Sequence, residues 1–209
     1  MKKQYHRSIT MQALEAHFNP EALETAVAAN LGQDAWWYQF GHDHFHYDNN
    51  SFAAGNAYLD QLRRSVVEAL GRGEALPARQ LFGRLTHTAQ DFYAHSNYIT
   101  LWRESHPEAV PEEVDPLLAA LITSPRLCSG RIYYPLEAFS FLPALKPYVV
   151  PLLPRDSHAW MNLDDPSRPG FDCAHAAAVK RTKLEFERIC QELCPEQIQL
   201  WTGLQNPKA

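Results

Sequence analysis

The segment from His87 to Tyr98, His-Thr-Ala-Gln-Asp-Phe-Tyr-Ala-His-Ser-Asn-Tyr, constrains the fold of this chain most strongly. It contains no helix breaker and carries His87, Asp91 and His95 at a spacing of four residues. Because each residue advances about 100° around an α-helix, side chains four apart lie only about 40° apart on successive turns. Imidazoles and carboxylates are ligands of zinc and similar ions. The segment therefore predicts a helix that points three metal ligands toward one spot, although a solvated helix face would show the same pattern.

The remainder of the chain also has helical patterns. Apolar residues recur at helical spacing, the stretches end at glycine or proline, and no stretch shows the sustained alternation of a strand. We expect an all-α fold: one domain over residues 1–209, a helical bundle with long connecting loops and an internal site for several metal ions. The expected helices cover residues 8–17, 20–32, 52–70, 77–102, 111–122, 172–194 and 196–204, with a short one near 136–145.

Composition narrows the classes of function. A net charge of −5 over 209 residues argues against a broad surface for nucleic acid. The first residues lack the apolar core of a secretory signal, and no run of about 18 apolar residues is present. We therefore expect a cytoplasmic protein as synthesised, with export by another route left open. The four cysteines form no C-x-x-C pair, which favours reduced thiols.

A histidine-rich, aromatic stretch over residues 35–50 predicts a loop laid across the core. Trp36, Trp37 and Tyr38 are expected to line a substrate cleft, with plain core packing as the alternative. His46 is the preferred ligand from this loop. His44 is the alternative ligand, and His42 is expected to orient a ligand without binding the metal itself.

The proline-rich stretch 132–154 cannot form a long helix. Packing on the core is the simpler interpretation, and peripheral contact with a membrane through residues 139–154 is the other.

Several motifs, in chain order, resemble those of the zinc-dependent phospholipase C and single-strand nuclease superfamily, in particular its Het-C-like branch. The segment 87–98 is similar to the Het-C-type pattern H-T-x-Q-D-F-Y-[SA]-H-S-N-W. The supporting motifs are His6-Arg-Ser-Ile-Thr10, Asn30-Leu-Gly-Gln-Asp34, His46-Tyr-Asp-Asn49 and Trp160-Met-Asn-Leu-Asp164. The resemblance implies a cluster of two or three zinc ions.

The resemblance also implies how the ligands divide among the ions. Asp34, His46, His87 and Asp91 would hold one zinc, and Asp91 would bridge to a second that His6 also binds. His95 and His175 would hold a third. The motif carboxylate expected four residues after His175 is Val179 here, so the missing ligand would be Asp172, His158, Asp164 or water.

By the same resemblance, the expected function is phospholipase C-type hydrolysis of phospholipid headgroups, with Asp34 as the catalytic carboxylate that orients or deprotonates the attacking water. The expected partner is a phospholipid or another phosphodiester, and nucleic acid is less favoured. The alternatives are a single-strand nuclease or nucleotidase, a Het-C-like membrane-acting cell-death toxin, and a scaffold that zinc merely stabilises.

Overall fold

The computed structural model describes residues 1–38, 41–142 and 144–205. The predicted all-α fold is confirmed: the described part of the chain contains helices and no strand. None of its helices combines the length and apolar composition needed to span a bilayer. The elements are α1 (Lys3–Leu14), α2 (Pro20–Gly32), η1 (Trp36–Tyr38), α3 (Asp43–His46), η2 (Asp48–Asn50), α4 (Phe52–Gly71), α5 (Ala75–His95), α6 (Tyr98–Ser105), η3 (Pro111–Glu113), α7 (Ala119–Ile122), η4 (Leu136–Phe141), α8 (Lys146–Val149), η5 (Val150–Leu152), α9 (His158–Met161), α10 (Phe171–Cys190) and α11 (Pro195–Thr202).

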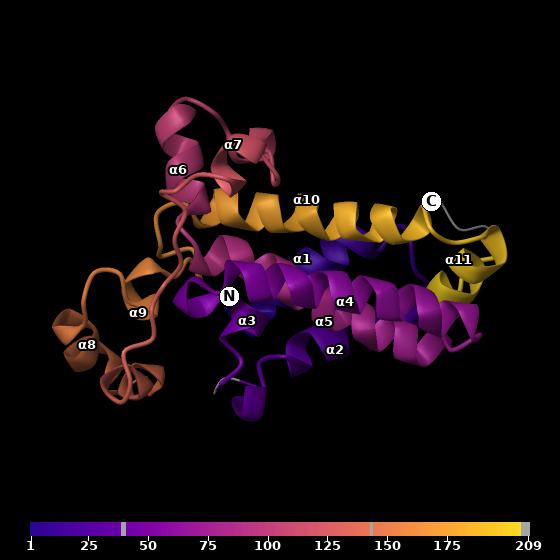
Figure 1. Cartoon of the computed structure of the whole chain (residues 1–209), viewed down its shortest axis with the longest axis horizontal. Helices are drawn as coiled ribbons and strands as arrows, with labels where there is room; N and C mark the ends of the chain where they lie inside the picture. Colours follow the sequence, from indigo (N-terminus) through magenta and orange to yellow (C-terminus); the bar gives the residue numbers. More distant parts are fainter. Residues whose placement is uncertain (39–40, 143, 206–209) are drawn as a thin grey trace.

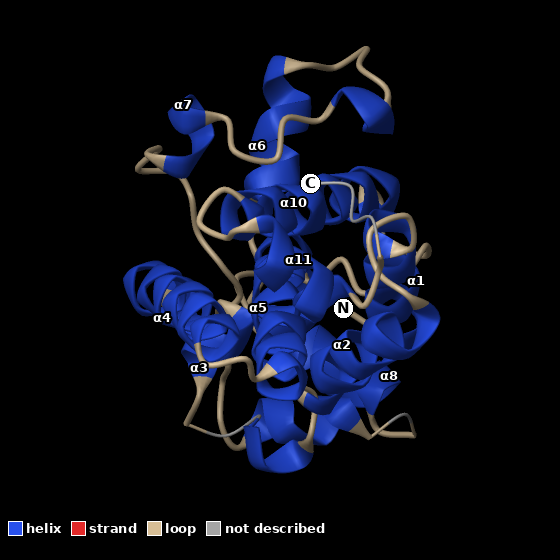
Figure 2. Ribbon diagram, turned by 90° about the vertical axis from the view of Figure 1, so that its right-hand side faces the viewer, coloured by secondary structure: helices blue, strands red, loops and turns tan. Residues whose placement is uncertain are grey.

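Helix α5 is the central element of the bundle. It packs against α2, α4 and α10, and α1 lies against α2 and α10. The long helices run side by side in Figure 1, and the end-on view of Figure 2 shows α5 between its neighbours. Every residue from Leu85 to Ser96 is buried, so this part of α5 is covered on all sides. A helix enclosed in this way carries its polar side chains into the interior.

Close packing of α2 on α5 depends on a glycine. A Cβ atom at Gly83 would overlap the carbonyl oxygen of Ala26 and lie 2.8 Å from the Cβ of Ala29. Since any side chain at this position would push the helices apart, Gly83 lets α2 bring Asn30 and Asp34 toward α5.

Two predicted boundaries are wrong in ways that matter for the site. The first helix begins at Lys3 rather than near Ser8, so His6 lies inside α1 instead of before it. The helix that carries the ladder, by which we mean His87, Asp91 and His95, ends at His95 instead of continuing to about residue 102. Ser96 is extended there, and Asn97 bonds to the backbone of Arg126 and Cys128. These tertiary bonds replace the helical ones.

The predicted helix over 111–122 is also wrong. Only η3 and α7 form within it, each a single turn. Elsewhere the proline and glycine signals place the ends of the helices well. Asn19 caps α2 through a bond from the backbone nitrogen of Ala22, with Pro20 as first residue, and α4 ends at Gly71.

Residues 132–154, which we call the lobe, lie to one side of the bundle (Figure 1). As the prolines predict, the lobe forms only short turns, η4, α8 and η5, which pack chiefly on one another. Pro143 lies outside the described residues. The fully buried carboxylate of Glu137 ties the lobe to α9, because its oxygens accept bonds from the backbone nitrogens of Tyr133 and Ala159.

Candidate metal centre

Three side chains from two helices form a compact triangle at the centre of the site. His87 and Asp91 come from α5, and His46 comes from the end of α3. Asp91 Oδ2 lies 2.9 Å from His46 Nδ1 and 3.0 Å from His87 Nε2, and the two ring nitrogens are 3.2 Å apart. His87 and Asp91 are fully buried and His46 nearly so. Two buried imidazoles and one buried carboxylate oxygen therefore face a common point.

His6 approaches the other oxygen of Asp91. Its Nε2 atom lies 3.2 Å from Asp91 Oδ1, and its ring stacks on that of His87 with the centroids 4.2 Å apart. The Nδ1 atom of His6 lies 2.7 Å from Gln90 Oε1. The orientation of the Gln90 amide is set by its Nε2, which donates to Thr10 and Thr182. In neutral His6 the proton therefore lies on Nδ1, and the Nε2 lone pair faces a carboxylate oxygen, an arrangement that a cation between them would stabilise.

Asp34 completes this side of the cluster. It follows the end of α2, and its Oδ1 lies 3.6 Å from His87 Nε2. Its side chain is 18% exposed, whereas Asp91 is fully buried. Asp34 is therefore the carboxylate of this group that solvent can reach.

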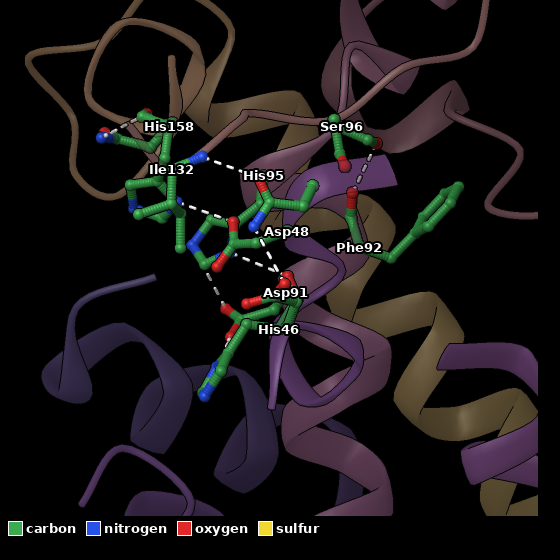
Figure 3. Close-up of polar contacts among 12 residues, drawn as sticks. His46, Asp48, Asp91, Phe92, His95, Ser96, Ile132 and His158 are labelled. Atoms are coloured by element: carbon green, nitrogen blue, oxygen red, sulfur yellow. Dashed lines mark hydrogen bonds and ion pairs between the residues drawn. The ribbon is translucent and has the colours of Figure 1, made fainter. Parts of the chain in front are cut away.

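A second group of ligand-type side chains lies around His95, as Figure 3 shows. The Nδ1 atom of His95 lies 2.9 Å from the carbonyl oxygen of His46, an acceptor that fixes the proton there and leaves Nε2 as the ligand atom. Nε2 lies 3.5 Å from Asp164 Oδ1 and 3.8 Å from Asp91 Oδ1. Asp91 thus presents one oxygen to His46 and His87 and the other to His6 and His95.

His158 and Asp48 form a pair beside His95. His158 Nδ1 lies 2.7 Å from Asp48 Oδ1, and the His95 and His158 rings meet edge to face at 4.4 Å (Figure 3). The left-handed backbone at Tyr47, φ 60°, separates His46 from Asp48. The Tyr47 ring fills the space beside Gly55, where an added Cβ would lie 2.7 Å from it. The close packing of Tyr47 therefore fixes the turn that positions His46 and Asp48.

The amino group of Met1 lies among these ligands. It is 2.7 Å from Asp91 Oδ1, 3.2 Å from Asp164 Oδ1 and 3.3 Å from His95 Nε2. Burial lowers the pKa of this amine, but Asp91 and Asp164 outweigh burial and raise the pKa to about 11. The point between the three side chains is therefore one that favours a positive charge.

The charges of the site are strongly coupled. Burial alone would raise the pKa of Asp91, but the Met1 amine and the surrounding histidines hold it well below its usual value. Burial lowers the pKa of His87 to about 4, so this imidazole is neutral near pH 7. A neutral imidazole beside an ionised carboxylate is the protonation state that metal binding requires.

The donor set fits divalent metal ions. Nitrogen and oxygen donors without a thiolate suit zinc, and a tetrahedral zinc site with bonds of about 2.0–2.1 Å has ligand atoms about 3.3 Å apart. The triangle around Asp91 Oδ2 has edges close to that length. Three buried ring nitrogens of these histidines have no hydrogen-bond partner. His6 Nε2 faces Asp91 Oδ1, whereas His46 Nε2 and His87 Nδ1 are the ring atoms opposite those in the triangle. Buried polar atoms usually have partners, so the protein atoms alone do not satisfy this cluster.

The cluster opens to the surface through a pocket of about 470 Å³. Trp36 and Ala138 also line this pocket, so the bundle and the lobe both contribute to its wall. The ligand-type side chains that line it are Asp34, His46, His95, His158 and Asp164.

Two predicted residues do not reach the cluster. His175 lies on α10 and contacts Ser8 Oγ at 3.3 Å, and with Asp172 it lines a different pocket. The expected pairing of His95 with His175 is therefore wrong. The structure instead places His158, Asp164 and Asp48 beside His95, because α9 packs at the end of α5 while His175 faces α1.

The other residues of the histidine-rich loop divide as follows. His42 stacks on Phe45 at 4.7 Å, and His44 packs against Phe45 and Tyr58, so both face the aromatic side of α3. His46 is the histidine of this loop that the structure brings to Asp91.

The aromatic residues predicted to line a cleft also separate. Trp36 lines the pocket above the cluster. Trp37 packs on Tyr38 and is 58% exposed, and Tyr38 lines a separate pocket beside α2. Only Trp36 therefore lies where the cleft was expected.

Sequence reasoning missed Asp48 and Gln90 as members of the site. Asp48 stands within the motif His46-Tyr-Asp-Asn49, but that motif supported the resemblance and the choice of His46 and assigned no role to Asp48. Gln90 stands beside Asp91 and is fully buried. A buried glutamine next to a ligand is the available signal for a residue that orients histidine.

Comparison with known proteins identifies a different family from the one the motifs resemble. A family model described as the VWA7 N-terminal domain matches residues 2–114. Two relatives are von Willebrand factor A domain-containing protein 7 of Rattus norvegicus, 33% identical over 87 residues, and of Homo sapiens, 36% identical over 88 residues. Each match covers 41% of this chain and 10% of the relative. No solved structure matches the chain.

These matches correct the expectations that rested on resemblance. Membership of the phospholipase C and nuclease superfamily, phospholipid or phosphodiester hydrolysis, and a Het-C-like toxin are all contradicted, because the chain matches another family. The segment 87–98 lies within the matched residues. The ladder that resembled the Het-C pattern is therefore part of the region through which this chain belongs to the VWA7 N-terminal domain family.

Proposed function

We propose that this domain binds two or three divalent metal ions, zinc first among them, in the interior site around Asp91. The observation that carries the proposal is the triangle of Asp91 Oδ2, His46 Nδ1 and His87 Nε2, with edges of 2.9–3.2 Å. These edges match the ligand spacing of a zinc tetrahedron, about 3.3 Å. Asp91 is fully buried and accepts from the Met1 amine at 2.7 Å, so its carboxylate lies at a position that holds a positive charge, which supports the proposal.

The ligands divide by the oxygen of Asp91 that they face. One ion would lie on the Oδ2 side, with Asp34, His46 and His87. A second would lie on the Oδ1 side with His6. Where a third is bound, the residues that would hold it are His95, His158 and Asp164, with Asp48 orienting His158.

A catalytic use of the metal centre is the second candidate function, and the pocket favours it. A structural zinc site is closed by its protein ligands, whereas a catalytic one keeps a position open. Here five ligand-type side chains line a pocket that reaches the surface. Divalent ions held by such ligands lower the pKa of water toward neutrality. Asp34 is partly exposed beside this pocket and is the carboxylate that we assign to accept a proton.

The first experiment counts metal ions in protein purified without added zinc. Two or three zinc ions per chain are expected, and their complete absence, together with no uptake of zinc in a calorimetric titration, would overturn the proposal. His46→Ala should remove at least one ion. His44→Ala, from the same short helix but packed on Phe45 and Tyr58, is the matched control and should keep all of them.

A second experiment tests catalysis. Zinc-loaded protein should hydrolyse p-nitrophenyl acetate, a generic probe of activated water, faster than the chelated protein does. Asp34→Asn should lose most of this activity. The zinc affinity of the sites to which Asp34 does not belong should stay unchanged. Equal rates with and without zinc would remove the catalytic candidate and leave metal binding untouched.

A further inference from the structure

Exposed apolar side chains lie more densely in the lobe than elsewhere on the described part of the chain. Tyr148 is 75% exposed and Leu152 is 71% exposed. Val149 and Leu153, their sequence neighbours, are buried in a small core with Ala159. The outward side chains are therefore held on a folded base. The exposed large side chains of the lobe are Tyr134, Leu136, Phe139, Leu142, Leu145, Tyr148 and Leu152.

The lobe has very few charges. Residues 134–154 contain only two charged side chains, Glu137 and Lys146. Glu137 is fully buried and bonded to backbone nitrogens, and Lys146 is exposed. Arg131 and Arg155, at the two edges of the lobe, are exposed as well, against one exposed acid, Asp156. The exposed part of the lobe is thus apolar with one lysine, on a chain whose net charge is −5. At its edges Arg131 pairs with Asp156 and Arg155 lies over the Trp160 ring.

We infer that the lobe docks on an anionic phospholipid bilayer, with its leucines and aromatic rings in the headgroup and acyl boundary and Lys146 at the headgroups. Apolar and aromatic side chains with basic neighbours are what interfacial membrane contacts use. Negatively charged lipid attracts nearby lysine and arginine side chains.

The polar content of the lobe favours a bilayer over a protein partner. Protein interfaces carry about one hydrogen bond per 100–200 Å². Residues 134–154 offer few exposed side-chain donors or acceptors, among them Tyr134, Lys146 and Tyr148. The acyl region of a bilayer contains no hydrogen-bonding groups that the lobe would have to match. This surface therefore fits a lipid bilayer better than another protein. The inference depends on the surface of the lobe alone and stands apart from the metal centre.

The test measures binding of the full chain to vesicles of phosphatidylcholine mixed with phosphatidylserine. Binding is expected, and it should weaken on vesicles of phosphatidylcholine alone and at high salt. The double variant Tyr148→Ser/Leu152→Ser should lower the affinity at least about tenfold, because two side chains lose their burial in lipid. Lys146→Glu should lower it about fivefold, an effect that salt removes.

The matched control is Leu76→Ser/Leu200→Ser. These leucines are 56% and 38% exposed and lie on the first turn of α5 and on α11, away from the lobe (Figure 1). This variant should bind vesicles like the unaltered chain. Thermal unfolding and zinc content of every variant report whether the fold is intact.

Three outcomes would overturn the inference. One is the absence of binding to both kinds of vesicle. Another is an equal loss of binding in the control variant. The third is self-association in sedimentation velocity that Tyr148→Ser/Leu152→Ser abolishes while vesicles remain unbound, which would assign the surface to a second copy of the chain.

Discussion

Arg63, Arg181 and Glu185 form one buried polar group in the bundle, and the histidines and aspartates around Asp91 form another. Glu185 accepts bonds from Arg181 Nε at 2.7 Å, from Arg63 Nη2 at 2.9 Å and Nε at 3.2 Å, and from Arg188 Nη1 at 3.1 Å. No side-chain atom of these four residues is both buried and without a partner. Protein atoms alone satisfy the buried polar atoms of this group.

The cluster around Asp91 differs in this respect. Three of its ring nitrogens are buried without a hydrogen bond, and one of them, His6 Nε2, faces Asp91 Oδ1. Both groups are buried in the same bundle, so burial alone does not identify a binding site. Protein atoms satisfy the group around Glu185, whereas His6 Nε2 lies unpartnered beside a carboxylate oxygen, which is the difference expected if the group around Asp91 binds a metal ion.

Asp91→Asn tests most directly whether the cluster around Asp91 differs from the group around Glu185 in binding metal. This variant removes the carboxylate that His6, His46 and His87 share, so we expect zinc affinity to fall at least about 100-fold, or about 3 kcal/mol. Mass spectrometry should find at most one zinc per chain. Asp172→Asn, on the surface of α10, is the matched control and should keep the full zinc content. Retention of every ion by Asp91→Asn would contradict the comparison.

Glu185→Gln should destabilise the protein without changing its zinc content. The variant leaves Arg181 buried without its counter-charge, which typically costs about 3–5 kcal/mol. Urea unfolding followed by circular dichroism measures the loss, and the loss should be the same with and without a chelator. A zinc-dependent loss would mean that the two polar groups are not independent.

The same variant has a defined pH dependence. Burial raises the pKa of the Glu185 carboxyl, but Arg181 and Arg63 outweigh it and hold the pKa below its usual 4.5. The ionised carboxylate therefore contributes stability above about pH 4.5 and loses it as the pH falls through the folded-state pKa. The difference between the unaltered chain and Glu185→Gln should be largest above pH 4.5 and shrink in acid. A difference that grows in acid would reverse this assignment.

Asp48→Asn should have a smaller effect confined to one part of the metal centre. Asp48 orients His158 rather than lying in the triangle, and residues in that role typically change metal affinity by about 10–100-fold. A calorimetric titration should show a lower zinc affinity at one site and unchanged affinities at the others. Uniform weakening of all ions would place Asp48 in a general structural role.

His175→Ala should have the smallest effect. His175 contacts Ser8 on a different face of the molecule, so zinc content should stay the same and the free energy of unfolding should change by less than about 0.5 kcal/mol. Loss of a zinc ion would restore the pairing of His95 with His175 that the structure contradicts.

Local features of the sequence determined the helices and the first ligands. Pro20, Gly71 and the run from His87 to His95 act on their immediate neighbours through capping, backbone freedom and helical spacing. For the same reason the all-α fold and the common face of His87, Asp91 and His95 were predictable. The resemblance pointed to His6, Asp34 and His46, which the structure brings to that face, although the family it named was wrong.

Tertiary structure decided the remainder. The helix stops after His95 because Asn97 bonds to residues 126 and 128, a contact across about thirty positions that no local pattern reveals. His158 rather than His175 lies beside His95 because Glu137 and the lobe hold α9 at that end of the bundle. Helical spacing acts over one or two turns, whereas the packing of distant elements sets which side chains meet across the core.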